Sequence, residues 1–295
     1  MKKPALIKGV AAAAALIVSG AAGANEMFID LTGIQSVNGT TYDFVPIDGD
    51  ATTGIFNEFG FSQFLATSIY DFSDGLITGS FFDTNNQTTL TGLGLPISGA
   101  SMGGPIVNLK LPNCSLGQCD IDALSPLVPP PTNDGEGFGL TWDLQVVYTF
   151  NGTLGAGGPV YTGGTMDFYF NPIPLFGGNP LDYQLAFSAS LTGSNLQAAN
   201  LDLFFDVTYA LPGFLYVDNG SGFVDASLGG VTLALDTNVN PPIPSPNQLL
   251  LVGNNAIRQT TLDGSITAQV PAPGTLALLG LGLAGLGARL RGRRS

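Results

Sequence analysis

Histidine is absent from this chain of 295 residues, and cysteine occurs only twice. Without histidine, the usual Ser–His or Cys–His nucleophile pair cannot be assembled. Zinc, copper and non-haem iron sites also draw on histidine and cysteine, so these metals are not expected. The composition therefore predicts a protein that is not an enzyme and that needs no cofactor of these kinds.

Positive charge is almost confined to the two ends of the chain. Between residues 25 and 269 only Lys110 and Arg258 are cationic, whereas all 22 acidic residues lie there. Two cations against 22 acids give this stretch a formal charge of −20. Nucleic-acid binding needs lysine and arginine to neutralise phosphates, so an acidic surface of this kind excludes it.

The N-terminus has the three parts of a secretory signal peptide. Basic residues come first: Lys2, Lys3 and Lys8. An apolar run over residues 9–18 follows, and then small residues that include Ala22 and Ala24. A retained anchor would need an apolar run of about 20 residues, so removal is favoured over retention. We therefore expect residues 1–24 to be a signal peptide that engages the export machinery and is cut by signal peptidase after Ala24.

The last part of the chain contains a second apolar segment. Residues 275–288 read TLALLGLGLAGLGA and predict a short transmembrane helix. Four arginines follow it: Arg289, Arg291, Arg293 and Arg294. Because basic residues stay on the cytoplasmic side of a membrane, the body of the protein is expected on the outer side.

Two prolines stand just before this segment, in the order Val270, Pro271, Ala272, Pro273. Residues 270–295 thus resemble the PEP-CTERM sorting signal, in which a proline-containing motif, an apolar helix and a basic end follow one another. Ala272 stands where the family usually has glutamate. The resemblance implies processing by an exosortase-type membrane protease in a Gram-negative bacterium that makes exopolysaccharide. It also implies transient anchoring in the inner membrane and delivery to the outer surface or the extracellular matrix. An ordinary C-terminal anchor is the alternative.

The two cysteines, Cys114 and Cys119, flank a glycine and lie five positions apart. In an exported protein, such a close pair is most simply a disulfide that closes a surface loop. A redox-active pair is the alternative, but it would normally have a two-residue spacing.

Alternating apolar residues run through the body, which we place at residues 25–269. The alternation is clearest over residues 138–150, 183–191 and 201–211, and it returns over 166–170 and 231–235. Such a pattern is typical of antiparallel strands with one buried face. We therefore predict an all-β body, an antiparallel β-sandwich of jelly-roll type, with helices only in the signal peptide and the C-terminal segment.

Turn signals separate the predicted strands. The pairs Asn151-Gly152, Asn219-Gly220 and Asp263-Gly264 are typical of hairpin turns. The proline-rich stretches 126–131 and 241–246 cannot donate to a ladder and predict extended surface connections.

Acidic residues offer the remaining chemistry. Asp218 and Asp225 bracket a short glycine-containing turn, which makes them weak candidates for Ca²⁺ ligands, although a plain hairpin turn explains them as well. Close carboxylates such as Asp71 and Asp74 could in principle hydrolyse a glycosidic bond, but their setting is that of a turn.

Two function classes remain open. The first is an exported surface or matrix protein without catalytic activity, associated with exopolysaccharide, biofilm or flocculation, as the family resemblance implies. The second is a secreted carbohydrate-binding protein, or a carboxylate-based enzyme acting on glycans, with Trp142 as an aromatic platform. Because Trp142 lies in the apolar register of its strand, we expect it in the core instead.

Overall fold

The computed structural model describes residues 24–34, 36–37, 40–41, 51–94, 123–127, 142–172, 184–239 and 241–270. The cysteines, most of the signal peptide and the C-terminal segment from Pro271 onward lie outside these residues. The predictions of a signal helix, a disulfide and a short transmembrane helix therefore stay predictions.

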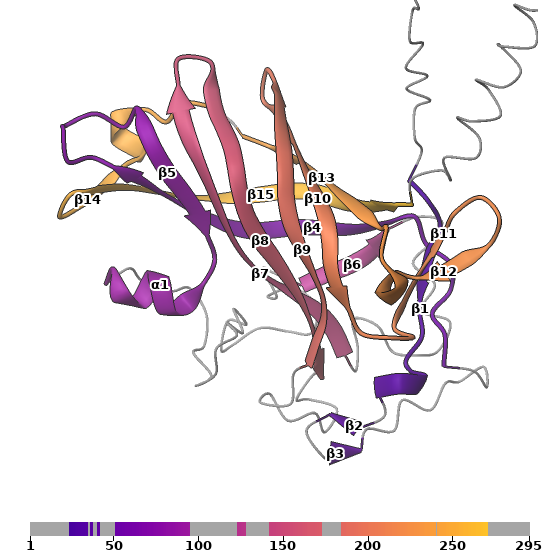
Figure 1. The fold of residues 1–295 in the computed structure, drawn as a ribbon. Coiled ribbons are helices and arrows are strands. Elements are labelled where there is room, and N and C mark those ends of the chain that lie inside the picture. Colours follow the sequence, from indigo (N-terminus) through magenta and orange to yellow (C-terminus); the bar gives the residue numbers. More distant parts are fainter. Residues whose placement is uncertain are drawn as a thin grey trace, which may run out of the picture.

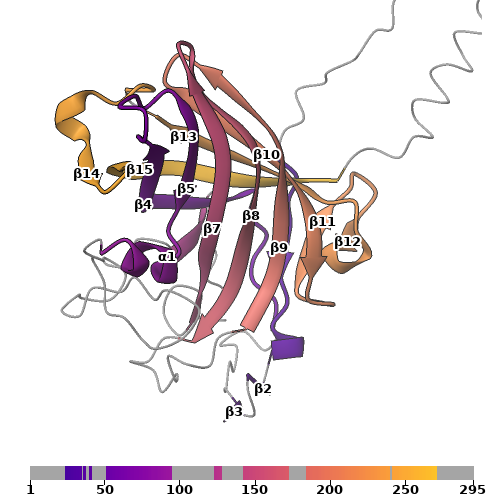
Figure 2. The same cartoon turned by 60° about the vertical axis from the view of Figure 1, so that its left-hand side comes forward.

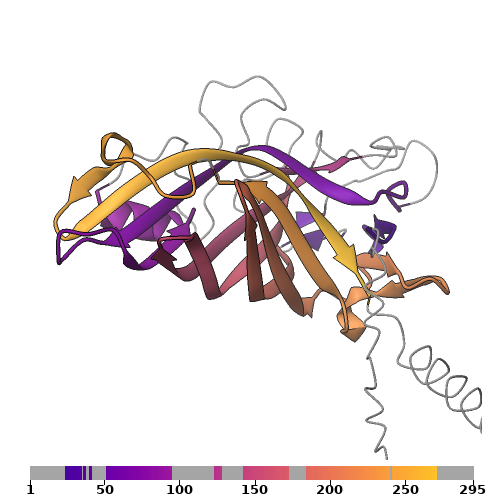
Figure 3. The ribbon, with the colours of Figure 1, turned by 90° about the horizontal axis from the view of Figure 1, so that it is seen from above.

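Strands dominate the described part of the chain, which confirms the prediction of an antiparallel all-β body (Figure 1). Eight of them follow one another around a single sheet: β4 (Glu58–Asp71), β5 (Gly79–Thr84), β7 (Trp142–Gly155), β8 (Gly158–Pro172), β9 (Gln184–Gln197), β10 (Asn200–Ala210), β13 (Thr232–Asn238) and β15 (Asn255–Gln269). β15 then pairs with β4, so the sheet closes on itself. β4 and β15 arch across β8, β9 and β10, which gives two facing layers (Figure 3). The layers predicted as a sandwich are thus parts of one closed sheet whose strands follow the chain order, without jelly-roll crossovers.

Two short strands complete this sheet. β6 (Ala123–Leu127) pairs with both β4 and β7, so β5 and β6 share the space between these two long strands. Pro126 of β6 lies opposite Phe59, which corrects the expectation that residues 126–131 form only a surface connection. β14 (Leu250–Val252) lies on the other side of β15 from β4.

A smaller sheet lies at one end of the closed sheet. It consists of β1 (Met27–Ile29), β11 (Leu215–Asp218) and β12 (Phe223–Asp225). The ring of Phe28 stacks on that of Tyr216, with 4.8 Å between their centroids. A separate pair is formed by β2 (Ser36–Val37) and β3 (Thr40–Thr41).

Helices are short in the described residues. They are η1 (Thr32–Ile34), α1 (Gln87–Gly92), η3 (Ala226–Leu228) and η4 (Pro246–Gln248). Within the ranges that the structure describes, no helix has both the length and the apolar character that a membrane crossing requires. The sequence did not predict α1, which follows β5 directly.

The core fills the interior between the two layers. Strand alternation puts the apolar residues of β7 inside, and the buried members are Trp142, Leu144, Val146, Tyr148 and Phe150. Trp142 has no exposed surface, and its ring stacks on that of Phe170 with 5.2 Å between centroids. This confirms Trp142 as a core residue and removes it as an aromatic platform for sugars.

Bulges change the register that simple alternation predicts. In β10 the pairing skips Thr208, so Tyr209 is 43 % exposed although the alternation over residues 201–211 predicted it to be buried. Asn151-Gly152 lies within β7, whose hairpin turn is formed instead by Ala156 and Gly157. The predicted turn at Asp263-Gly264 likewise lies inside β15, at the point where the pairing of β15 with β4 shifts between Leu262 and Gly264.

The prediction for Asn219-Gly220 is confirmed. This pair lies in the turn between β11 and β12, where the backbone N–H of Asn219 donates to the carbonyl oxygen of Gly222 at 3.0 Å. Residues 241–246 were predicted to form a surface connection, but Pro244 within them is buried.

Candidate functional site

A groove lies on the outer face of the closed sheet. Its volume is about 650 Å³. It is lined by residues from β4, β5, β7, β8 and the start of β15: Ile69, Asp71, Ser80, Phe81, Phe82, Asn151, Gly152, Thr153, Thr162 and Asn255. Side chains alternate between the two faces of these strands, so one sheet supplies both the groove and the core beneath it.

Alternation explains which side chains face the groove. Asn151 and Thr153 of β7 are exposed, whereas Phe150 of the same strand is buried in the core. Asn151 lies opposite Phe82, and Thr153 lies opposite Ser80. Directly opposed residues on neighbouring strands place their side chains on the same face, so these four groups form one surface.

A bulge shapes the next strand. β8 pairs Tyr161 with Gly152 and Gly163 with Asn151, which leaves Thr162 as the extra residue. The Thr162 hydroxyl donates to the carbonyl oxygen of Asn151 at 3.4 Å. Gly164 follows with φ of 143°, and a Cβ at this position would lie 2.3 Å from the carbonyl oxygen of Thr149. Glycine therefore allows the strands to approach closely where β8 bends.

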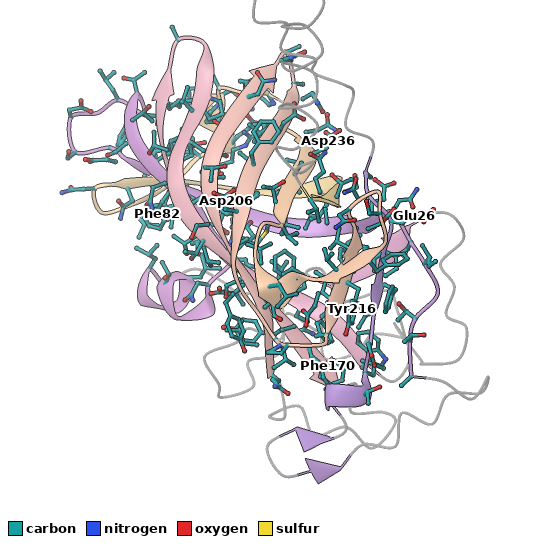
Figure 4. All side chains as sticks on the ribbon, turned by 45° about the vertical axis from the view of Figure 1, so that its right-hand side comes forward. Glu26, Phe82, Phe170, Asp206, Tyr216 and Asp236 are labelled. Carbon is teal, nitrogen blue, oxygen red and sulfur yellow. The ribbon has the colours of Figure 1, made fainter. Side chains whose placement is uncertain are left out.

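Helix α1 lies beside β4 and β5 (Figure 2), where it packs on Ile69 and Phe82, two residues that also line the groove. Leu90 of α1 packs with the outward-facing Ile69 and Ile257, and Phe82 packs against this cluster. Figure 4 places Phe82 on the side of the molecule that carries α1, away from Glu26. The groove thus has an apolar flank next to its polar strands.

Two asparagines fix the start of α1. The Asn85 side chain donates to the carbonyl oxygen of Val146 at 2.7 Å and accepts from the N–H of Tyr148 at 2.8 Å. The Asn86 side chain accepts from the N–H of Thr89 at 3.2 Å. These contacts hold the apolar flank in place relative to β7.

Negative charge dominates the electrostatics of the groove. Asp71 is exposed, and its carboxylate accepts from the backbone N–H of Ser73 at 3.0 Å. Hydrogen bonds from Ser73 hold the pKa of Asp71 below its ordinary value. The ten lining residues include neither lysine nor arginine. At neutral pH the part of the groove that the structure describes therefore carries a carboxylate and no lining cation.

A buried polar cluster lies on the inner face of the same strands. Asp83 of β5 accepts a hydrogen bond from the Tyr161 hydroxyl of β8. Burial raises the pKa of Asp83 to about 6, and its hydrogen bonds to Tyr161 and Ser68 oppose the increase. Arg258 of β15 is also buried, and its guanidinium donates to the carbonyl oxygen of Pro241 at 3.0 Å.

This cluster joins strands that are not neighbours. Tyr161 and Asp83 belong to β8 and β5, which are separated by β7 in the sheet. The other oxygen of Asp83, Oδ1, has no hydrogen-bond partner among the described residues. We assign the cluster to the architecture of the interior, because the ring of Tyr161 also packs edge-on against Phe81 and so sits within the aromatic core.

The weak Ca²⁺ candidates bind backbone groups in the structure. Asp218 accepts from the N–H groups of Gly220 and Gly222 at 3.0 and 3.2 Å in the turn. Asp225 caps η3 by accepting from Ser227 and also accepts from Gly213, both at 2.8 Å. In the part of the chain that the structure describes, no three acidic or sulfur ligands come together as a metal site.

The two acids singled out on the β4–β5 connection also serve turns. Asp71 accepts from Ser73 and Asp74 accepts from Leu76, at 3.0 and 2.9 Å. The groove residues Ser80, Phe82, Asn151 and Asn255 were not predicted from the sequence. The alternation of the apolar Phe150 and Leu154 could have placed Asn151 on the outer face of a strand. The pair Asn151-Gly152 indicated a hairpin turn instead.

The two chain ends of the body lie side by side (Figure 1). The backbone N–H of Asn25 donates to the carbonyl oxygen of Ala268 at 3.1 Å, and its side-chain amide donates to that of Asp218 at 2.7 Å. Cleavage after Ala24 would thus leave the new N-terminus next to the point where β15 ends. Of the predicted sorting and cleavage residues, only Ala24 and Val270 are described.

Comparison with protein families gives one match. The PEP-CTERM protein-sorting motif matches residues 269–294, the stretch in which the sequence showed this resemblance. Neither curated proteins nor solved structures yield a match. The motif identifies an exported protein that is sorted to the cell surface and processed by an exosortase-type membrane protease.

Proposed function

We propose that this protein is a surface or extracellular-matrix protein without catalytic activity, which associates with exopolysaccharide and supports biofilm or floc cohesion. The observation that carries the proposal is the sorting motif at residues 269–294, which begins where the last strand of the folded body ends. The body is then the part that remains outside the cell. The motif is a sorting signal that anchors the protein transiently in the inner membrane of a Gram-negative bacterium.

The position of the ends supports this role. Asn25 and Ala268 are hydrogen-bonded, so both processing sites leave the body at one corner. β15 spans 15 residues, from Asn255 in the groove to Gln269 at this corner. At about 3.3 Å per residue, the strand places the groove roughly 45 Å along its path from the tail. The groove and the attachment point of the tail therefore lie at opposite ends of β15.

The arrangement of acids favours binding over hydrolysis. Glycosidases of the common type need two carboxyl groups on either side of the scissile bond. Among the described lining residues of the groove, Asp71 is the single acid, and its carboxylate also holds the turn at Ser73. A carboxylate-based glycan hydrolase is accordingly the weaker candidate.

A secreted carbohydrate-binding protein is the second candidate function. The outer groove favours it, because a concave surface with mixed apolar and polar lining is the usual form of a small-molecule site. This candidate is compatible with the first, since a matrix protein can be retained by binding the matrix polymer.

Processing of the tail tests the sorting part of the proposal. Top-down mass spectrometry of surface and matrix fractions should find a mature protein that begins at Asn25 and ends near residues 271–275. Changing Arg289, Arg291, Arg293 and Arg294 to serine should abolish surface delivery, whereas changing the same four to lysine keeps the charge and should preserve it. Recovery of a membrane-bound protein that still ends at Ser295 would show a plain anchor instead.

The cohesion role needs a separate test. A strain without this protein should form flocs or biofilms that disperse at lower shear than those of the parent, and expression of the full chain should restore cohesion. Equal dispersal of the two strains would overturn the matrix role. Glycan hydrolysis by the purified mature protein would overturn the assignment as a non-enzyme.

A further inference from the structure

The geometry points to the outer groove as a binding site for a segment of a neutral polysaccharide. This inference rests on the proposed function, because it names the class of polymer that the exported body would hold. It goes further in locating the contact on β4, β5, β7 and β8 and in specifying an uncharged ligand.

The lining has the two kinds of surface that a sugar chain presents. A sugar ring offers apolar C–H faces and a rim of hydroxyl groups. In the groove, Phe82 is half-buried and offers the apolar surface, and it packs against the buried Ile69 and Leu90 beneath it. Hydroxyl, amide and carboxylate groups that can donate to or accept from sugar hydroxyls stand beside them: Asp71, Ser80, Asn151, Thr153 and Asn255.

The size of the groove fits a short run of sugar rings. Its volume of about 650 Å³ falls within the range of small-molecule sites. The groove is open to solvent, and its lining comes from the adjacent strands β4, β5, β7 and β8 and from the start of β15. An open surface of this kind can contact the interior of a chain as well as its end.

Charge decides between neutral and anionic polymers. Among the described residues, the lining contains one carboxylate and no cation, and the body as a whole carries a formal charge of −20. An anionic polymer would meet repulsion from both the local and the overall charge. A neutral chain would meet no electrostatic repulsion from these charges. The ionised Asp71 could accept hydrogen bonds from the hydroxyl groups of that chain.

The site is held in shape before a ligand arrives. The bulge at Thr162 is fixed by its hydrogen bond to the carbonyl of Asn151, and Asn85 ties the start of α1 to β7. Groups that are already ordered lose less conformational entropy on binding, so a rigid β face favours affinity. Each of these contacts lies within a strand or at a helix start.

The test uses mature protein purified from the culture or matrix fraction of the native host. Neutral hexasaccharides of β-1,3-glucan, β-1,4-glucan, α-1,4-glucan and mannan are titrated by calorimetry, with oligogalacturonate as the anionic probe. We expect binding of at least one neutral hexasaccharide and no binding of oligogalacturonate. Binding of oligogalacturonate alone, or of none of the neutral probes, would overturn the inference.

Three variants assign the binding to the groove. Asn151→Ala removes an exposed amide and should weaken binding of the neutral hexasaccharide about tenfold, as expected for a lost hydrogen bond at a ligand. Thr153→Lys should weaken it similarly and give measurable binding of oligogalacturonate. The control is Thr208→Lys, which adds the same charge at an exposed position on β10 and should leave both titrations unchanged.

Thermal unfolding of each variant accompanies the titrations, and Ser80→Lys on β5 provides a second groove variant if one of them melts early. Unchanged binding in every folded groove variant would overturn the inference.

The fraction of protein in the matrix and its C-terminus are measured in the same cells. A protein that is cut and retained in the matrix but binds no neutral glycan would contradict the groove alone, whereas absence from the matrix would contradict the proposed function.

Discussion

The inner and outer faces of the neighbouring strands β4 and β5 hold two aspartates whose pKa values shift in opposite directions. Asp83 lies inside, where burial raises its pKa to about 6. Asp71 lies outside, where hydrogen bonds from Ser73 lower its pKa. The difference shows that environment, and not residue type, separates structural acids from those available to a ligand in this acidic chain.

The two faces also differ in how they resist change. Inside, Ser68, Asp83 and Tyr161 connect β4, β5 and β8 within a packed aromatic core. Outside, α1 covers part of the alternate residues, and beyond it Ser80, Asn151 and Thr153 are exposed polar groups. Substitutions should therefore affect stability on the inner face and ligand binding on the outer face.

The largest expected effect on stability is a contrast between substitutions at two neighbouring residues of β7. Phe150 is buried against Tyr148, Tyr161 and Phe205, so Phe150→Ala should lower the free energy of unfolding by about 3–5 kcal/mol. Asn151→Ala, one position along on the outer face, should change it by less than about 0.5 kcal/mol. Urea unfolding of both variants measures the contrast, and equal losses would show that the two faces are not distinct.

The second prediction concerns pH. The folded carboxyl of Asp83, with a pKa of about 6, keeps its proton to higher pH than an unfolded aspartate does. Stability should therefore be greatest near pH 4 and fall as the pH rises through 6, by about 3 kcal/mol for a shift of roughly two units. Asp83→Asn should remove this part of the fall and make the protein more stable than the parent at pH 7.

Urea unfolding between pH 4 and pH 7.5 measures this effect. Loss of self-repulsion at low pH acts in the same direction, so the control is Asp206→Asn on the exposed face of β10. That variant removes the same charge and should keep the pH dependence of the parent. Identical curves for the two variants would contradict a buried Asp83.

A smaller effect is expected from the tyrosine that contacts Asp83. Tyr161→Phe removes the hydroxyl donor and leaves a buried carboxyl with less compensation, which should cost about 1–3 kcal/mol. Tyr209→Phe is the matched control, because Tyr209 is 43 % exposed. The cost of Tyr161→Phe should shrink when Asp83 is already asparagine, and a double-mutant cycle measures this coupling. Additive effects would argue against the contact.

The smallest change in stability is expected at Asp71. Asp71→Asn keeps an oxygen that can accept from the N–H of Ser73, so the urea midpoint at neutral pH should not move measurably. Binding of the neutral hexasaccharide should still weaken, because a charged acceptor is replaced by a neutral one. A clear drop in the urea midpoint would place Asp71 with the structural acids.

The sequence by itself determined the class of structure and the destination of the protein. The alternation at Trp142–Phe150 and at residues 166–170 and 231–235 correctly identified buried faces, because the period of a strand is a local property. The sorting motif was also visible in the order of prolines, apolar residues and arginines. Both kinds of signal depend on residues close together in the chain.

Only the tertiary structure decided how the strands close and where a site forms. The pairing of β15 with β4 joins Asn255 to Asp71 across the sheet, and the groove requires this closure. Asn151-Gly152 has the local chemistry of a turn, yet β5 and β8 pair with it on both sides and keep it within β7. Likewise the burial of Asp83 and the exposure of Tyr209 follow from long-range register and bulges. Contacts between distant segments outweigh local preference at these positions, because each strand gains hydrogen bonds and packing from both neighbours.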